Sequence, residues 1–141
     1  MLAHGLVSSG LFSLVNILYD TTCTRSIYLT KGFINLLPCI SFFIFIFCCI
    51  NIGAPLTINL LSEILLLVRI ISISLKFSIL LGLRSFMAGV YSLFLFTSTQ
   101  HGSLVSYLNG LYSFNSRIIT SLFLHISPVI LLIFRPECVV L

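Results

Sequence analysis

A single carboxylic acid within a long apolar stretch is the residue of this sequence best suited to chemistry. Glu63 comes eight residues after an interruption at residues 53–55, and the chain around both is apolar from residue 33 to about residue 71. A carboxyl group inside a membrane is costly, and it normally faces the interior of a helix bundle on an ion or proton pathway. The sequence therefore predicts that Glu63 binds and releases a proton.

Two further polar residues are expected to act with Glu63. Asn59 precedes it by one helical turn on the same face. Arg84 reaches a similar depth if the helices on either side of a turn near Ser74 run antiparallel, so we expect it to pair with Glu63 or to tune it. Lipid favours the neutral acid and a nearby cation favours the carboxylate. The alternatives are a static Glu–Arg pair used in assembly, and an Arg84 that faces another subunit or a lipid phosphate.

Histidine is the other residue type here that can transfer protons, because its ring has two nitrogens that can each carry one. His4 forms an i, i+4 pair with Ser8 on the first predicted helix, and we expect His4 to relay protons. His125 stacks with Ser121 in the same way, but Pro128 beside it favours a structural bend. In both cases the alternative is a packed, hydrogen-bonded histidine.

The composition indicates whether the chain lies in water or in a lipid bilayer. Of its 141 residues 59% are hydrophobic and 7% are charged, and the mean hydropathy is +1.22. Soluble domains carry about a quarter charged residues, so the sequence predicts an integral membrane protein. The net charge of +4 comes from scattered residues rather than a run, which gives nucleic-acid binding no support. The beginning of the sequence has no basic region and is not expected to be a signal peptide.

The apolar segments predict one all-α membrane domain over residues 1–141, with about four transmembrane helices. We expect these at residues 2–19, 33–52 together with 56–72, 77–97 and 118–134. Placed end to end, the segments 33–52 and 56–72 would extend about 60 Å at 1.5 Å per residue, whereas the hydrocarbon core is about 30 Å thick. Length alone therefore allows either two crossings or one discontinuous helix, and the charges do not decide the orientation.

Motifs for other kinds of chemistry do not occur in the sequence. There is no nucleophile triad, phosphate-binding loop, metal cluster or dinucleotide fingerprint. The five cysteines show no CxxC spacing and are expected to be free, buried thiols. We therefore expect no cofactor and no metal to be bound by this chain.

Four stretches resemble one known family. They are MLAHGLVSSGLF at residues 1–12, NIGAPLTINLLSE at 51–63, YSLFLFTSTQHG at 91–102 and LHISP at 124–128. Together they resemble the subunit 4 family of mitochondrial NADH:ubiquinone oxidoreductase, the antiporter-like proton-pumping subunits of respiratory complex I. The resemblance covers essentially the whole chain and implies the last four helices of a fourteen-helix subunit. It also implies that the break at residues 53–55 belongs to one discontinuous helix.

The resemblance assigns roles to two residues. Glu63 matches the acid that ends the central polar axis of the family towards the intermembrane space, and His4 matches a histidine on that axis. The implied activity couples NADH-to-ubiquinone electron transfer to proton translocation across the mitochondrial inner membrane. The implied partners are other complex I membrane subunits and the lipid bilayer, with protons as the only small substrate. NADH, flavin, iron–sulfur clusters and ubiquinone would be handled by other subunits.

The sequence also departs from the family pattern. Ser62 stands where the family usually has glycine, and Arg69 and Arg84 are charges that the family does not lead us to expect. Two other functions remain open on the residues: a multi-subunit cation/proton antiporter of related fold, and a membrane assembly subunit that does not pump.

Overall fold

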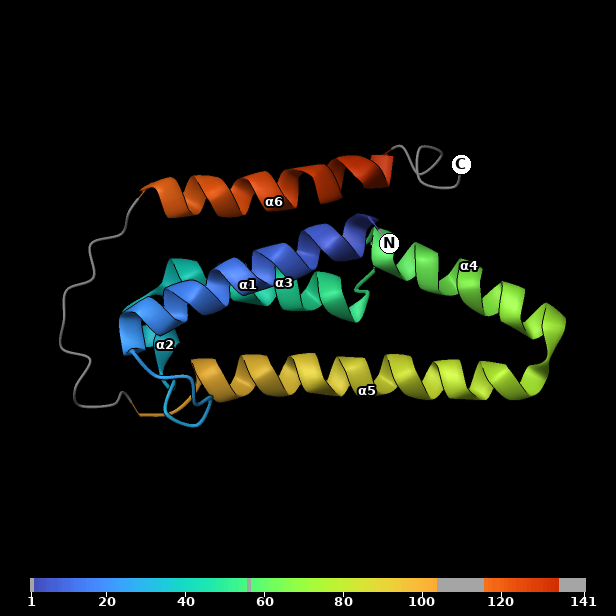
Figure 1. The fold of residues 1–141 in the computed structure, drawn as a ribbon, viewed down its shortest axis with the longest axis horizontal. Coiled ribbons are helices and arrows are strands. Elements are labelled where there is room, and N and C mark those ends of the chain that lie inside the picture. Colours follow the sequence, from blue (N-terminus) through green and yellow to red (C-terminus); the bar gives the residue numbers. More distant parts are fainter. Residues whose placement is uncertain (1, 56, 104–115, 135–141) are drawn as a thin grey trace.

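The computed structural model describes residues 2–55, 57–103 and 116–134, and these residues form helices joined by turns and loops. Figure 1 shows the helices lying roughly along one long axis. Their bounds are α1 Leu2–Thr22, α2 Phe33–Leu36, α3 Pro38–Ile52, α4 Ile58–Ile73, α5 Leu75–Gln100 and α6 Ser116–Phe134. The predicted all-α membrane fold is confirmed.

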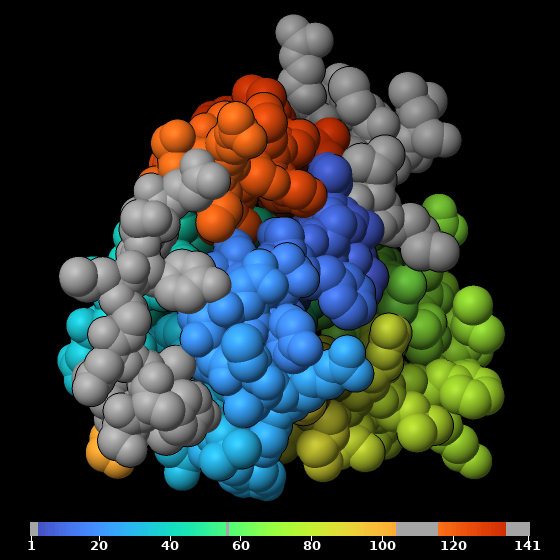
Figure 2. Space-filling model, turned by 60° about the vertical axis from the view of Figure 1, so that its left-hand side comes forward, coloured from blue at the N-terminus to red at the C-terminus, as the bar shows by residue number. Residues whose placement is uncertain are grey.

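The core lies between α1, α3 and α6. Val7 and Leu14 of α1, Phe47 of α3 and Leu122 of α6 are all at most 1% exposed. In the space-filling view the side chains of α6 lie directly on those of α1 (Figure 2). On the other side α1 meets α3 so closely that a Cβ on Gly10 would overlap the Phe47 ring. A residue without a side chain is therefore needed where these two helices approach each other.

The predicted discontinuity is present between α3 and α4. α3 ends at Gly53, whose φ of 81° lies in the left-handed region, and α4 begins after Thr57. The two helices continue in the same general direction, and the long helix α5 returns antiparallel beside both of them (Figure 1). Two separate crossings would need a hairpin at this point. The arrangement is therefore one interrupted helix, as the resemblance implied.

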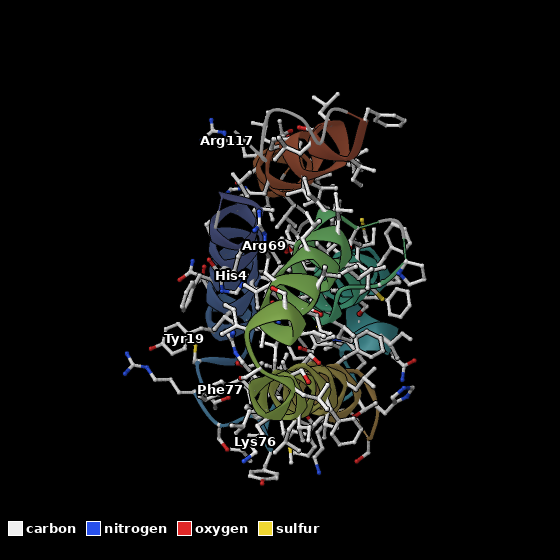
Figure 3. All side chains as sticks on the ribbon, turned by 90° about the vertical axis from the view of Figure 1, so that its right-hand side faces the viewer. His4, Tyr19, Arg69, Lys76, Phe77 and Arg117 are labelled. Atoms are coloured by element: carbon white, nitrogen blue, oxygen red, sulfur yellow. The ribbon has the colours of Figure 1, made fainter. Side chains whose placement is uncertain are left out.

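The α4–α5 hairpin extends beyond the core. Its turn is made by Ser74, which has an extended backbone and separates the two helices. Lys76 and Phe77 lie just after this turn, and in the end-on view they are seen at the start of α5 (Figure 3). Within α5 the buried residues are Ser92, Thr99 and Gln100, which lie in its second half. The first half of α5 and most of α4 therefore present apolar side chains outwards.

Two helices in the described part of the chain are long and apolar enough to cross a bilayer, namely α5 and α6, and α3 is apolar but shorter. α1 is expected to be a crossing by position, although it contains Gly5, Gly10 and several polar side chains. These small and polar residues allow close helix packing in membranes. α3 reaches the length of a crossing only together with α4.

Several helix bounds differ from the predicted ones. α1 runs to Thr22 rather than to residue 19, and α5 runs from Leu75 to Gln100 rather than over 77–97. The polar end of α5 is also helical, and there the hydroxyls of Thr97 and Thr99 donate to carbonyls one turn earlier. The predicted helix 33–52 is divided at Leu37, since the residue before a proline is forced out of helical geometry.

Candidate functional site

The carboxyl end of α3 is closed by its own backbone. The Ala54 N–H donates to the Cys49 carbonyl (3.0 Å), and the Gly53 N–H donates to the Ile50 carbonyl (3.2 Å). This pair of bonds, with Gly53 in the left-handed region, is a Schellman motif. Glycine is needed here because other residues adopt this conformation only at a cost of roughly 1–2 kcal/mol. The end of α3 is thus an ordered cap in which the Cys49 and Ile50 carbonyls both accept hydrogen bonds.

Asn59 connects the two helices across the break. Its side-chain nitrogen donates to the Ile50 carbonyl at 2.9 Å, and the residue is buried. The start of α4 is capped by Thr57, whose hydroxyl oxygen accepts from the Leu60 N–H (3.4 Å). Backbone groups freed by a broken membrane helix must find such partners. Asn59, predicted to act beside Glu63, therefore has a direct contact with the end of α3.

Glu63 lies on the second turn of α4, and its carboxylate reaches back to the break. A Cβ built on Gly53 would be 3.5 Å from Glu63 Oε2 and 3.7 Å from Glu63 Cδ. Side chains on a helix lean towards its N-terminus, which here carries the partial positive charge of the helix dipole. The acid and the interruption, which are separated by eight residues in sequence, thus form one site.

A second contact at this site was not anticipated from the sequence. Asn51, near the end of α3, donates from its side-chain nitrogen to the Ser92 hydroxyl oxygen of α5 (3.1 Å). Ser92 in turn donates to the Ala88 carbonyl at 2.9 Å. The signal that could have revealed this contact is Asn51, a polar residue two positions before the interrupting glycine that needs a partner inside the bundle.

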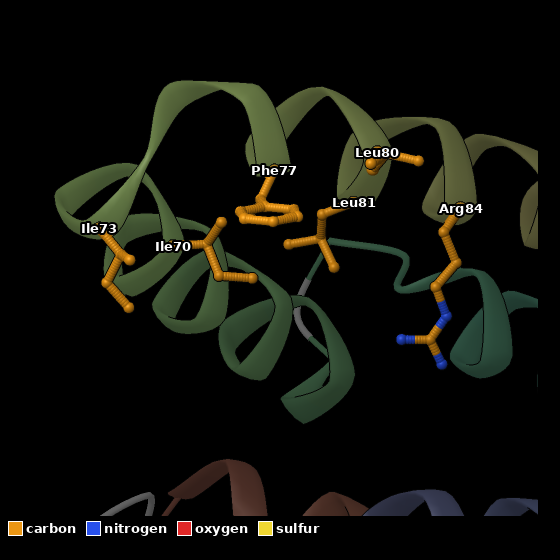
Figure 4. A pocket seen from close by; sticks show the side chains of 6 residues that line it. All are labelled: Ile70, Ile73, Phe77, Leu80, Leu81 and Arg84. Carbon is orange, nitrogen blue, oxygen red and sulfur yellow. The ribbon is translucent and has the colours of Figure 1, made fainter.

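Arg84 lies on α5 at one end of a groove between α4 and α5. The groove has a volume of about 430 Å³ and is lined by Ile70, Ile73, Phe77, Leu80, Leu81 and Arg84. Figure 4 shows Ile73 at one end, near the turn, and the Arg84 guanidinium at the other. No ion pair between Glu63 and Arg84 occurs among the described residues. The expected direct pairing is therefore not seen, and any influence of Arg84 on Glu63 acts over a longer distance.

His4 lies near the start of α1, which contacts α4. In the end-on view His4 is on α1 and Arg69 is on the neighbouring α4 (Figure 3). His4 is exposed, and no hydrogen bond joins it to Ser8 or Glu63 in the described part of the chain. The Ser8 hydroxyl instead donates to the Gly5 carbonyl (2.9 Å). The two predicted proton carriers are thus on contacting helices without touching each other.

The remaining candidates lie away from the break. His125 Nδ1 is 2.7 Å from the Ser121 carbonyl within α6, which includes Pro128.

Four cysteines are free, as predicted, but Cys23 and Cys39 are exposed, so the expectation that they are buried was wrong for these two. Both are outside the packed core because one is in the loop after α1 and the other is on the first turn of α3. Cys138 is outside the described residues.

An interrupted membrane helix with a carboxyl group beside the interruption is a feature shared with secondary transporters, whose discontinuous helices form ion sites. A sequence model described as "NADH:quinone oxidoreductase/Mrp antiporter, TM" matches residues 1–89. The match includes α1, the whole break and Glu63. The chain belongs to this family.

Individual relatives support the same assignment. The chain is 43% identical to a protein of Lumbricus terrestris over 99% of its own length and 31% of the relative. It is 44% identical to proteins of Anopheles arabiensis and Aedes aegypti, over 96% of this chain and 61% and 30% of the relatives. All three are named NADH-ubiquinone oxidoreductase chain 4. The chain spans about a third of the length of two of them and less than two thirds of the other.

Proposed function

We propose that the chain is part of a proton-translocating membrane subunit of NADH:ubiquinone oxidoreductase, located in the mitochondrial inner membrane. The observation that carries the proposal is the proximity of the Glu63 carboxylate to Gly53 at the helix break, where a Cβ on Gly53 would be 3.5 Å from Glu63 Oε2. The names of the relatives support the choice of complex. In this function the chain couples NADH-to-ubiquinone electron transfer to proton movement, together with other membrane subunits and the surrounding lipid.

In the proposed mechanism Glu63 takes up a proton and later releases it. Glu63 is exposed on α4, and its carboxylate lies near Gly53 at the helix break. His4 relays protons from the neighbouring helix, and Asn59 keeps the end of α3 and the start of α4 together. Arg84 adjusts the electrostatic potential without a direct ion pair.

The redox reactions of the complex are proposed to take place in other subunits. Flavin, iron–sulfur clusters, NADH and ubiquinone need sites of their own. Among residues 2–55, 57–103 and 116–134 there is no group of three histidine, cysteine or acidic side chains that could hold a metal ion. Protons are the only species that this chain is proposed to handle.

A cation/proton antiporter is the second candidate, because the matching family description includes Mrp antiporters. The relatives named above favour the oxidoreductase. An assembly subunit without pumping is the third candidate. Sodium dependence separates the first two: translocation that requires Na⁺ rather than NADH oxidation would support the antiporter.

The test is a Glu63→Gln variant in the assembled complex, reconstituted in vesicles. Glutamine keeps the shape of the side chain but cannot carry the proton, so we expect fewer protons to be translocated per NADH oxidised. Ser62→Ala is the matched control, because Ser62 is adjacent and its hydroxyl only donates to the Asn59 carbonyl (2.8 Å). Unchanged rate and stoichiometry in Glu63→Gln, in a normally assembled complex, would contradict the role of Glu63.

A further inference from the structure

A fully buried amide side chain lies at the end of α5, well away from the helix break. Gln100 is the last residue of α5 and is 0% exposed. Its side-chain nitrogen donates to the Thr99 hydroxyl oxygen at 3.1 Å. The Thr99 hydroxyl donates its own proton to the Leu95 carbonyl (3.0 Å), so it can only accept from Gln100. In this arrangement the amide nitrogen faces Thr99 and the amide oxygen faces away from it.

The oxygen of this amide, Oε1, is buried and has no hydrogen-bond partner in the described part of the chain. Buried side-chain oxygens are nearly always hydrogen-bonded, to protein or to ordered water, because removal from water without a new partner is costly. Oε1 therefore points to a donor other than the described residues.

A second unpartnered oxygen belongs to the loop at the same end of the bundle. Thr24 Oγ1 is buried and likewise has no partner among the described residues. The loop that contains Thr24 and Lys31 lies against the end of α5, since a Cβ on Gly102 would be 3.3 Å from Lys31 Cβ. Two buried polar groups in need of partners thus come from two segments that meet at this end.

We propose that Gln100 Oε1 binds an internal water molecule, with the Thr24 hydroxyl as a further partner. A water molecule can donate to the amide oxygen and also accept from or donate to a hydroxyl, and buried waters typically make about three such bonds. A metal cation is disfavoured by the positive charge of Lys31 in the same loop. An anion is disfavoured because the available amide atom is an acceptor.

The test is a structure of the assembled complex at a resolution that shows ordered water, for the wild type and for Gln100→Leu. We expect density within hydrogen-bond distance of Gln100 Oε1 in the wild type and its loss in the variant. We also expect a lower thermal midpoint for Gln100→Leu, because the variant removes a partner of the water. Ser98→Ala is the control, since its hydroxyl donates within its own helix to the Leu95 carbonyl (3.1 Å).

Three results would overturn the proposal. One is an absence of density at Gln100 Oε1 together with a higher thermal midpoint for Gln100→Leu, as expected when an unpartnered acceptor is deleted. Another is a protein donor from a neighbouring helix at that position. The third is a sodium or potassium ion there, identified by its coordination. The test needs no turnover, so its outcome is independent of the role of Glu63.

Discussion

The two halves of this molecule bury similar residue types to very different degrees. In the part formed by α1, α3 and α6, Phe47 is 0% exposed and Leu14 is 1% exposed. In the α4–α5 hairpin Phe77 is 62% exposed and Ile73 is 79% exposed. The first part is held together by contacts within the chain. The hairpin instead offers its apolar surface to lipid or to further helices, as expected for a chain that spans only part of its relatives.

The helix break lies at the junction of these two regions. α3 belongs to the packed part, α4 belongs to the hairpin, and Asn59 joins them through the Ile50 carbonyl. Glu63 is on the hairpin side, but its carboxylate reaches the neighbourhood of Gly53 at the end of α3. A site at such a junction can change its surroundings when the hairpin or its neighbours move. The acid thus lies where its surroundings can change, and not inside the core.

The largest effect is expected from Phe47→Ala. Removal of a fully buried aromatic side chain leaves a cavity and costs about 3–5 kcal/mol. We expect a much lower thermal midpoint of the assembled complex and less assembled subunit. Phe77→Ala is the matched change in the hairpin and should cost much less. Equal losses would show that another helix covers the hairpin as tightly as the core, and would break the comparison.

The next largest effect is expected from Gly10→Ala, which tests the approach of α1 to α3. The added methyl group would overlap the Phe47 ring, and overpacking of this kind typically costs about 1–3 kcal/mol. The same change at Gly5 is the control, because a Cβ there meets nothing within 4 Å. Thermal midpoints of the two variants should differ clearly. If Gly10→Ala were as stable as Gly5→Ala, the close packing of α1 on α3 would be wrong.

A smaller effect is expected from Gly53→Ala at the break. The backbone there has φ of 81°, and a side chain in the left-handed region costs roughly 1–2 kcal/mol. Gly82→Ala in α5 should be neutral or stabilising by about 1 kcal/mol, because Gly82 is inside a helix with open space around it. The thermal midpoints of both variants, measured by differential scanning calorimetry of the complex, check the prediction. Equal destabilisation would mean that the hairpin surface at Gly82 is closely covered in the complex.

Much of the fold could be predicted from the sequence, because apolar length and the residues Gly53 and Pro55 are local signals. The division at Leu37 and the helical end of α5 were not predicted. The first depends on the effect of a proline on the residue before it. The second is a helix that continues through polar residues as far as Gln100. In both places the prediction followed the average character of the segment. It therefore continued the apolar helix across Leu37 and ended the other helix where the polar residues begin.

The site could be predicted only in part. Glu63 and the break were singled out by type and position, and the structure brings them together. The contact of Asn51 with Ser92 joins residues 41 positions apart, and one sequence does not contain that information. Arg84 was placed by counting residues from the turn, which gives a depth along the helix but not the direction of the side chain. Depth alone was therefore too little to establish an ion pair with Glu63.

The most direct test of the central claim is infrared difference spectroscopy of the complex during NADH-driven turnover. If Glu63 takes up and releases a proton, a carboxyl C=O band should rise and fall with turnover and should be missing in Glu63→Gln. The Ser62→Ala complex should keep the band. An identical carboxyl signal in the wild type and in Glu63→Gln would contradict the claim that the acid at the helix break carries the translocated proton.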